Sequence, residues 1–294
     1  MSESKISIAS LSLQYGITCF GGLRVYKAQG AMRVFRLKDH YHRLMTASKI
    51  LGMNFFIEWD TFKTIINDFI VANKPTSDFY LRPFVFSKTE QIAPRPSAGL
   101  VFELALYGVQ LGNYFDPNKG MRLMISSWRK FSDDALPTKA KAGGCYINSF
   151  LASSQAMQAG YDEALLLDQD GFVAEASVAN LLIVYNDRII MPPVGSAILD
   201  GITMRTVIEI LKEENVPVFF EKIDRSMIYS AQEILLMGTA AQISFVQSVD
   251  DRPINGHLHS LATGPGSLAK MLRGIFSDIV AGKHKLSATY LFDF

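Results

Sequence analysis

The segment at residues 136–149, LPTKAKAGGCYINS, combines residue types that could do chemistry. It carries Lys139 and Lys141, followed by two consecutive glycines and Tyr146. A lysine amine can attack a carbonyl group, on a substrate or on a bound cofactor, and form a Schiff base with it. A Gly-Gly step allows the backbone to approach another group closely. Most lysines are surface charges, so this segment indicates catalysis only if the rest of the chain supplies the other parts of a site.

Three other segments could supply those parts for a pyridoxal phosphate site. Such a site needs a carboxylate near the pyridine nitrogen, donors for the phosphate and a group beside the ring hydroxyl. Glu175 stands in the apolar, small-residue run FVAEAS, where a purely structural acid is poorly placed. LDGIT at 199–203 puts a glycine and a threonine at the start of an expected helix, which favours anion binding. GTAA at 238–241 is a second tight turn. Each feature alone is an ordinary acid, cap or turn.

Other catalytic motifs are missing from the sequence. There is no G-x-x-x-x-G-K-[ST] loop, no G-x-G-x-x-G after a strand and no G-x-S-x-G elbow. His257 and His259 flank Leu258 in a Gly- and Asn-rich loop, without further metal ligands nearby in the sequence, so we expect solvated histidines and no metal site. A serine or cysteine triad has no support.

The composition limits the class of protein. The chain has 294 residues, 49% apolar and 19% charged, which predicts a sizeable folded core. A net charge of +1 without a long basic run argues against nucleic-acid binding. Only two cysteines, Cys19 and Cys145, fit a reducing cytoplasm. The N-terminus lacks signal-peptide features, and no apolar stretch is long enough for a membrane span. We therefore expect a cytoplasmic protein that acts on small molecules.

The periodicity of the first part predicts a small α+β unit. Residues 39–52 and 60–73 have helical character, with Asp60 as a candidate N-cap of the second helix. Strand-like runs surround them: TCFGGLRVY, YLRPFVFS and LVFELALYG. The polar, turn-rich segment 113–120 is a candidate linker.

The second part reads as short strands followed by helices. EALLLD, FVAEAS, NLLIVYN and RIIMPP are split by turn signals at 169–171 and 186–187. A helix is expected from about Thr203 to Glu214, then a strand, tight turn and strand over EILLMGTAAQISFVQSV. The run SLAKMLRGIFSDIVAG predicts an amphipathic helix ended by Gly282.

The order of these segments resembles the class IV aminotransferases, the fold-type IV pyridoxal phosphate enzymes, and within them the branched-chain amino-acid aminotransferases. The resemblance runs from about Tyr15 to Gly282. It rests on K-x-G-G-x-Y at 141–146, GYDEALLLD…GFVAE at 160–175, LDGITMR at 199–205, MGTAAQ at 237–242, Gly264-Pro265, YG at 15–16, FGGLRVY at 20–26, HYHRLMTASK at 40–49 and YLRP at 80–83. It implies an α+β, two-domain fold-type IV architecture, with a small α/β N-terminal domain at 1–115 and a larger, β-barrel-like, cofactor-binding domain at 116–294.

The resemblance implies a role for each matching residue at the cofactor. Lys141 would form the Schiff base with pyridoxal 5′-phosphate, and Lys139 is the weaker choice. Glu175 would face the pyridine nitrogen and keep it protonated, and Tyr146 would hydrogen-bond the ring hydroxyl. The other implied cofactor contacts are Arg43, Ile202, Thr203 and Thr239 at the phosphate and Leu199 on the ring face.

The resemblance also implies substrates and a partner. The activity would be a ping-pong transfer of an amino group between an L-amino acid, branched-chain or otherwise hydrophobic, and 2-oxoglutarate. Tyr80 and the N–H groups of Thr239 and Ala240 would bind the α-carboxylate. Arg82 and Tyr15 would receive the distal carboxylate of glutamate or 2-oxoglutarate, and the pocket would be shaped by Arg24 and Phe20. A loop from a second subunit completes the pocket in this family, so a homodimer is implied.

Four positions depart from the family pattern and leave the substrate open. Gly21 and Ala179 replace acids, and Gln242 replaces the last residue of the family's TAAE motif. Gln110 stands where branched-chain members commonly carry an aromatic residue. The alternatives are a D-amino-acid transaminase or an aminodeoxychorismate lyase of the same fold, and a binding homologue without catalysis. YLRP and FGGLR favour the L-branched-chain arrangement, and the intact Lys141 argues against the non-catalytic alternative.

Overall fold

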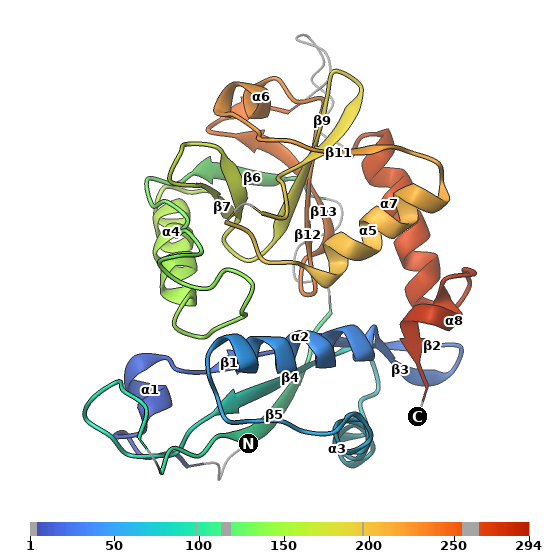
Figure 1. The fold of residues 1–294 in the computed structure, drawn as a ribbon. Helices are drawn as coiled ribbons and strands as arrows, with labels where there is room; N and C mark the ends of the chain where they lie inside the picture. Colours follow the sequence, from blue (N-terminus) through green and yellow to red (C-terminus); the bar gives the residue numbers. More distant parts are fainter. Residues whose placement is uncertain (1–4, 98, 113–118, 196, 255–264, 294) are drawn as a thin grey trace. The chain divides into compact units, whose positions relative to one another are not determined.

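The computed structural model describes residues 5–97, 99–112, 119–195, 197–254 and 265–293 (Figure 1). The chain falls into two compact units, one made of residues 1–112, 140–146 and 278–294, the other of residues 113–139 and 147–277. Most of the candidate linker at 113–120, both histidines of the 257–259 loop and Gly264 lie outside the described residues.

The first unit is built on an antiparallel sheet of six strands. Their order is β1 (Cys19–Phe20), β4 (Phe79–Phe86), β2 (Leu23–Ala28), β3 (Ala31–Phe35) and β15 (Leu291–Phe292), with β5 (Glu103–Gln110) also paired to β4. TCFGGLRVY, expected as a strand, is thus two strands that both pair with β4 on either side of a Gly-Gly step. The register sets Arg24 opposite Tyr80 and Arg82 opposite Tyr107.

Four helices belong to this unit: α1 (Leu11–Tyr15), α2 (Leu37–Ile50), α3 (Trp59–Asn73) and α8 (Ser287–Tyr290). The two expected helices are present, and α2 and α3 are in contact through the rings of Tyr41 and Phe62. The prediction of Asp60 as N-cap is wrong. The helix begins one residue earlier, at Trp59, so Glu58 takes the cap position and Asp60 lies in the first turn, where it forms an ion pair with Lys63.

The second unit contains a nine-stranded mixed sheet. Its order is β11 (Val218–Phe220), β10 (Arg188–Met191), β9 (Asn180–Tyr185), β12 (Glu233–Gly238), β13 (Gln242–Val249), β6 (Met121–Ile125), β7 (Glu163–Leu167) and β8 (Val173–Ala176), with β14 (Arg252–Pro253) paired to β13. The Ala176 N–H donates to the Ala179 carbonyl, so the chain passes from β8 into β9 through a tight turn. In the strand order, however, β9 and β8 are not neighbours. The sheet therefore curls, as the expected barrel-like domain requires.

Buried apolar side chains of this sheet form a core that includes Leu123, Leu165, Leu181 and Leu236. The helices are α4 (Tyr146–Gln158), α5 (Ile202–Glu213), α6 (Arg225–Tyr229) and α7 (Ser267–Val280). The expected turn at Asn186-Asp187 is confirmed, because both residues have positive φ between β9 and β10. The first residue of α4, Tyr146, belongs to the first unit, and so does the end of α7 from Asp278 onward.

Candidate active site

Lys141 lies in a short segment that is fastened to the first strand of the N-terminal sheet. The Phe20 N–H donates to the Lys141 carbonyl at 3.0 Å, and Cys19 forms a β-bridge with Ala142. The Lys141 Nζ atom lies 2.5 Å from the Tyr146 hydroxyl and 5.1 Å from the centre of the Phe20 ring. Lys141 and Tyr146, five residues apart, are therefore held together on one side of a turn.

The two glycines make this turn possible. The Gly143 N–H donates to the Thr18 carbonyl at 2.8 Å, and the Gly144 N–H donates to the Gly16 carbonyl at 2.9 Å. A Cβ atom on Gly143 would lie 2.1 Å from the Thr18 hydroxyl, well inside van der Waals contact. The close backbone approach expected from the Gly-Gly step is thus present, and its partner is the loop before β1.

The two lysines of the segment have different surroundings. The Lys139 ammonium, in the second unit, donates to the backbone carbonyls of Val194 and Ile198, the latter at 3.2 Å. These two carbonyl oxygens occupy the Lys139 nitrogen, which is therefore poorly placed to act as a nucleophile. The contacts of Lys141 are instead with a hydroxyl and aromatic rings.

Arg82 is the centre of an aromatic cluster in the same unit as Lys141. Its Nε and Nη2 atoms donate to the Tyr80 hydroxyl at 3.1 and 2.9 Å. The guanidinium lies 4.6 Å from the Phe20 ring centre and 5.7 Å from that of Tyr107. Burial raises the pKa of Tyr80 and the Arg82 charge opposes this shift, so the hydroxyl stays protonated. Gly22 leaves room for it, because a Cβ there would lie 2.4 Å from the Tyr80 oxygen.

Two other predicted substrate residues are engaged elsewhere. Arg24 is fully buried, and its guanidinium donates to the carbonyls of Leu111 and Gly112, which fastens the end of β5. The Tyr15 hydroxyl donates to the Ile92 carbonyl. Neither contact tests a role in substrate binding.

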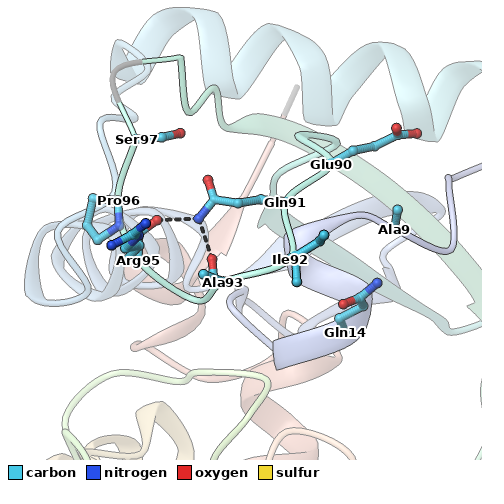
Figure 2. Close-up of a pocket in the computed structure, with 9 residues that line it drawn as sticks. All are labelled: Ala9, Gln14, Glu90, Gln91, Ile92, Ala93, Arg95, Pro96 and Ser97. Atoms are coloured by element: carbon cyan, nitrogen blue, oxygen red, sulfur yellow. Dashed lines mark hydrogen bonds between the residues drawn. The ribbon is translucent and has the colours of Figure 1, made fainter.

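Ile92 lies in the wall of a cavity of about 650 Å³ between α1 and the loop that follows β4 (Figure 2). Figure 2 shows the Gln91 amide donating to the carbonyls of Ala93 and Arg95, which ties this loop together. Lys141 and Arg82 are not among the residues that line this cavity.

Arg43, the predicted phosphate ligand, is half-buried on α2, one turn after His40. Burial, followed by the positive charges of Arg43 and Lys141, holds the pKa of His40 well below its usual value. The imidazole is therefore neutral, and among the described residues its Nδ1 atom has no hydrogen-bond partner.

Glu175, on β8 of the second unit, is a nearly buried carboxylate with three donors. Lys130 Nζ lies 2.7 Å from Oε1, and the Asn180 side-chain amide and the Leu199 N–H both donate to Oε2 at 3.1 Å. The Asn180 amide also donates to the Leu199 carbonyl at 2.8 Å. A structural acid at the surface would not need such partners. Lys130 belongs to no motif recognised in the sequence, and only its distance from Glu175 reveals it.

The expected anion sites have the expected backbone. Helix α5 begins after the cap residue Gly201, with Ile202 and Thr203 buried in its first turn and no acidic residue there. Gly201 must be glycine, because a Cβ would lie 1.9 Å from the Asn180 side-chain oxygen. Thr239 and Ala240 form the tight turn between β12 and β13. The N–H groups at a helix start favour phosphate.

The departures from the family pattern have local explanations in part. A Cβ at Gly21 would lie 3.1 Å from the Pro83 ring, and Ala179 is buried beside Gly238. Gln242 has a positive φ of 53°, and the Gln110 side chain donates to Thr76 at 3.4 Å.

Two expected absences concern the whole described chain. Within residues 5–97, 99–112, 119–195, 197–254 and 265–293, no group of three or more His, Cys, Asp or Glu side chains could hold a metal ion. None of the helices in that part of the chain is long and apolar enough to cross a membrane.

Comparison with known proteins gives the class. The family model described as amino-transferase class IV matches residues 18–249. A probable branched-chain-amino-acid aminotransferase of Aquifex aeolicus is 36% identical over 285 residues, covering 96% of this chain and 89% of that protein. The chain belongs to the class IV aminotransferases, and its cofactor is accordingly pyridoxal 5′-phosphate.

Solved structures narrow the likeness. The branched-chain aminotransferase of Thermoproteus uzoniensis, solved with norvaline, has a TM-score of 0.92 and 32% identity, and the match covers 99% of this chain and 94% of that chain. The branched-chain amino acid aminotransferase of T.th., complexed with N-(5′-phosphopyridoxyl)-L-glutamate, has the same TM-score and coverage at 33% identity. The fold-type IV architecture is thereby confirmed, and the enzyme is an aminotransferase similar to the branched-chain members.

Proposed function

We propose that the enzyme transfers amino groups between L-amino acids with aliphatic side chains and 2-oxoglutarate. The observation that supports this most directly is the position of Phe20. Its ring centre lies 4.6 Å from the Arg82 guanidinium and 5.1 Å from Lys141 Nζ. One aromatic ring thus lies close both to a cation suited to a carboxylate and to an amine suited to a carbonyl. Two similar enzymes were solved with compounds of these two kinds, one with norvaline and one with N-(5′-phosphopyridoxyl)-L-glutamate.

The donor sets of the two units fit the cofactor. Lys141 offers an amine, and Tyr146 a hydroxyl beside it. Glu175 is a charged acceptor suited to a pyridinium N–H, and its three described donors leave room for a fourth, since a carboxylate accepts about four hydrogen bonds. The phosphate would be held by Arg43, by the backbone at Ile202 and by the threonines at 203 and 239, with Leu199 on the ring face.

The bound cofactor supplies an electron sink that stabilises negative charge at the substrate Cα. Glu175 holds a proton at the ring nitrogen, which keeps that sink effective. With the cofactor bound, the Lys141 amine would serve as the general base that takes the substrate Cα proton and then as the general acid that gives a proton back. The N–H groups of Thr239 and Ala240 in the second unit, and the Tyr80 hydroxyl in the first, are each suited to donate to an α-carboxylate and so to orient the substrate.

Arg82 selects the second substrate. A planar guanidinium already held by the Tyr80 hydroxyl and flanked by rings can bind a carboxylate bidentately without much reorganisation. An aliphatic side chain would instead lie against Phe20 and Tyr107. Tyr15 would assist at the distal carboxylate. Arg24 would shape the pocket indirectly, because its buried guanidinium fixes the end of β5.

An amino-donor screen with 2-oxoglutarate as acceptor tests the proposal. We expect activity with L-leucine, L-isoleucine and L-valine. Activity confined to D-amino acids would assign the enzyme to the D-amino-acid transaminases, and release of pyruvate from aminodeoxychorismate would assign it to the lyases. A protein that binds the cofactor without any half-reaction would be a non-catalytic homologue.

We also propose that the enzyme is a homodimer. Ile147, Phe150 and Met157 are 66%, 70% and 67% exposed on α4, and such a row of large apolar side chains is rarely left in water. We expect Phe150→Glu to shift the sedimentation coefficient towards that of a monomer, and Gln158→Glu on the same helix to leave it unchanged. A wild-type monomer would contradict the proposal.

A further inference from the structure

Lys130 forms a nearly buried ion pair with Glu175 that the reaction as described above does not use. Lys130 Nζ lies 2.7 Å from Glu175 Oε1, and the two side chains are 9% and 8% exposed. Other ion pairs among the described residues of the second unit are far more exposed; Lys222 and Asp170, for example, are 55% and 70% exposed. The Lys130–Glu175 pair is therefore a buried one, with different energetics.

The backbone fixes Lys130 in this place. Its N–H donates to the Leu167 carbonyl at 2.8 Å, and its carbonyl accepts from the Gln169 side-chain amide at 2.8 Å. Its ammonium also lies 4.7 Å from the Phe131 ring centre. Strands β7 and β8 are paired neighbours, so the end of β7 sets the position of Lys130 relative to Glu175. The pair is thus organised by the sheet before any cofactor binds.

The charge of Glu175 is costly to bury without a partner. Moving a carboxylate out of water is strongly unfavourable unless an opposite charge and hydrogen bonds compensate. Lys130 supplies the opposite charge at Oε1, and the donors from Asn180 and Leu199 satisfy Oε2. Of these three groups only Lys130 is charged. The other two orient the carboxylate but do not neutralise it.

We infer that Lys130 is a positioning residue that keeps Glu175 charged and aimed, so that Glu175 can hold a proton at the cofactor's ring nitrogen. This inference rests on the proposed role of Glu175. Without the ammonium, the carboxylate itself becomes the more favourable place for that proton. The ring nitrogen then loses its proton at neutral pH, although Glu175 is still present.

The test uses holoenzyme reconstituted with cofactor labelled with ¹⁵N in the ring. The nitrogen resonance distinguishes a protonated from an unprotonated ring. The variants are Lys130→Met, Lys130→Arg, Glu175→Gln and the double variant Lys130→Met/Glu175→Gln. Lys222→Met is the matched control, since Lys222 also joins a carboxylate (Asp170, 3.3 Å) and an aromatic ring (Phe172, 4.5 Å), but at the surface.

We expect the nitrogen resonance of Lys130→Met to move towards the unprotonated value, with turnover reduced by about tenfold or more. Lys130→Arg and Lys222→Met should match the wild type. In the Glu175→Gln background, Lys130→Met should have little further effect, because Lys130 acts through Glu175. A purely structural lysine would lower turnover equally in both backgrounds and leave the resonance in place.

The outcomes separate this inference from the proposed function. If Glu175→Gln leaves the resonance unchanged, Glu175 does not face the ring nitrogen and the proposed role of Glu175 fails. If Glu175→Gln moves the resonance and Lys130→Met does not, the proposed role stands and the inference about Lys130 is overturned. Should Lys130→Met fail to fold, a Lys130→Arg holoenzyme with an unprotonated ring nitrogen would also overturn it.

Discussion

The amine nitrogen of Lys141 and the hydroxyl oxygen of Tyr146 lie 2.5 Å apart, at the two ends of one tight turn. The Tyr146 hydroxyl is therefore already in contact with the Lys141 amine when no substrate is bound. The turn holds together because Gly143 and Gly144 donate to the loop before β1. This relationship makes Lys141, and not Lys139, the lysine to test first.

Lys141→Ala should abolish both turnover and the cofactor link that borohydride can reduce, because the amine that forms the link is gone. Lys139→Ala is the control, since its ammonium donates to the carbonyls of Val194 and Ile198. Mass spectrometry of reduced protein checks both variants. A reduced adduct that persists in Lys141→Ala and disappears in Lys139→Ala would reverse the assignment.

Glu175→Gln should retain bound cofactor and lose most activity. A neutral amide cannot balance a pyridinium charge, and a loss of roughly 3 kcal/mol corresponds to about a hundredfold in rate. Glu163→Gln is the matched control, because Glu163 is an equally buried carboxyl group of the same unit. Steady-state turnover at saturating substrate is the measurement. Near-normal turnover of Glu175→Gln would show that another carboxylate serves the ring nitrogen.

Arg82→Ala should weaken the half-reactions of glutamate and 2-oxoglutarate by about two orders of magnitude, since a buried charge-assisted contact contributes roughly 2–4 kcal/mol. The leucine half-reaction should change much less. Arg33→Ala, which removes a half-buried arginine paired with the exposed Asp293, is the control. Single-turnover spectra separate the two substrates. Equal losses would mean that Arg82 binds the α-carboxylate or only supports the fold.

Gly143→Ala should lower turnover by about tenfold or more, because its methyl group would collide with the Thr18 hydroxyl and move Lys141. Gly144→Ala should have a smaller effect, since the nearest atom to its methyl group would be 3.4 Å away. The measurement is the turnover of both variants and of the double variant Gly143→Ala/Thr18→Ala, in which the Thr18 hydroxyl is absent. Failure of the second substitution to restore any activity would show that the hydroxyl is not the obstacle.

Glu163→Gln should change how stability depends on pH. Burial raises the pKa of Glu163 above its usual 4.5, so the folded protein favours the protonated form. The stability that this group contributes is fully present below pH 4.5 and is lost as pH rises through the folded value. The variant cannot lose this stability, so its melting temperature relative to wild type should rise as the pH increases above 4.5. A pH-independent difference would contradict this account.

Local patterns predicted most elements of the fold. The Asn186-Asp187 turn, the strands around it and the amphipathic α7 follow from residue type and spacing alone. The cap of α3 did not, because Asp60 and Glu58, two residues apart, are both acidic, and a shift of that size in the helix start leaves its apolar face unchanged. Propensity cannot decide between two such neighbours.

Motif order predicted which residues to examine at the site, but not what holds them. Glu175 stood out as an acid among small apolar residues. Its partner Lys130, 45 positions earlier, is an unremarkable lysine in SSWRKF until β7 and β8 pair. Tyr107 likewise becomes a neighbour of Arg82 only through the register of β4 and β5. Long-range pairing of this kind leaves no local signal in a single sequence.

The last strand of the chain, β15, completes the sheet that the first strands begin, by pairing Leu291 with Phe35. The N-terminal strands are synthesised first, but the edge strand β3 has no partner until β15, about 250 residues later in the chain, has been synthesised. At roughly 5–20 residues per second, the ribosome needs on the order of 10–50 s to reach it. During that time the growing chain exposes an unpaired strand edge, which is a template for aggregation. During its synthesis the enzyme must therefore avoid aggregation through the β3 edge, a requirement that ends once β15 has paired with β3 in the finished structure.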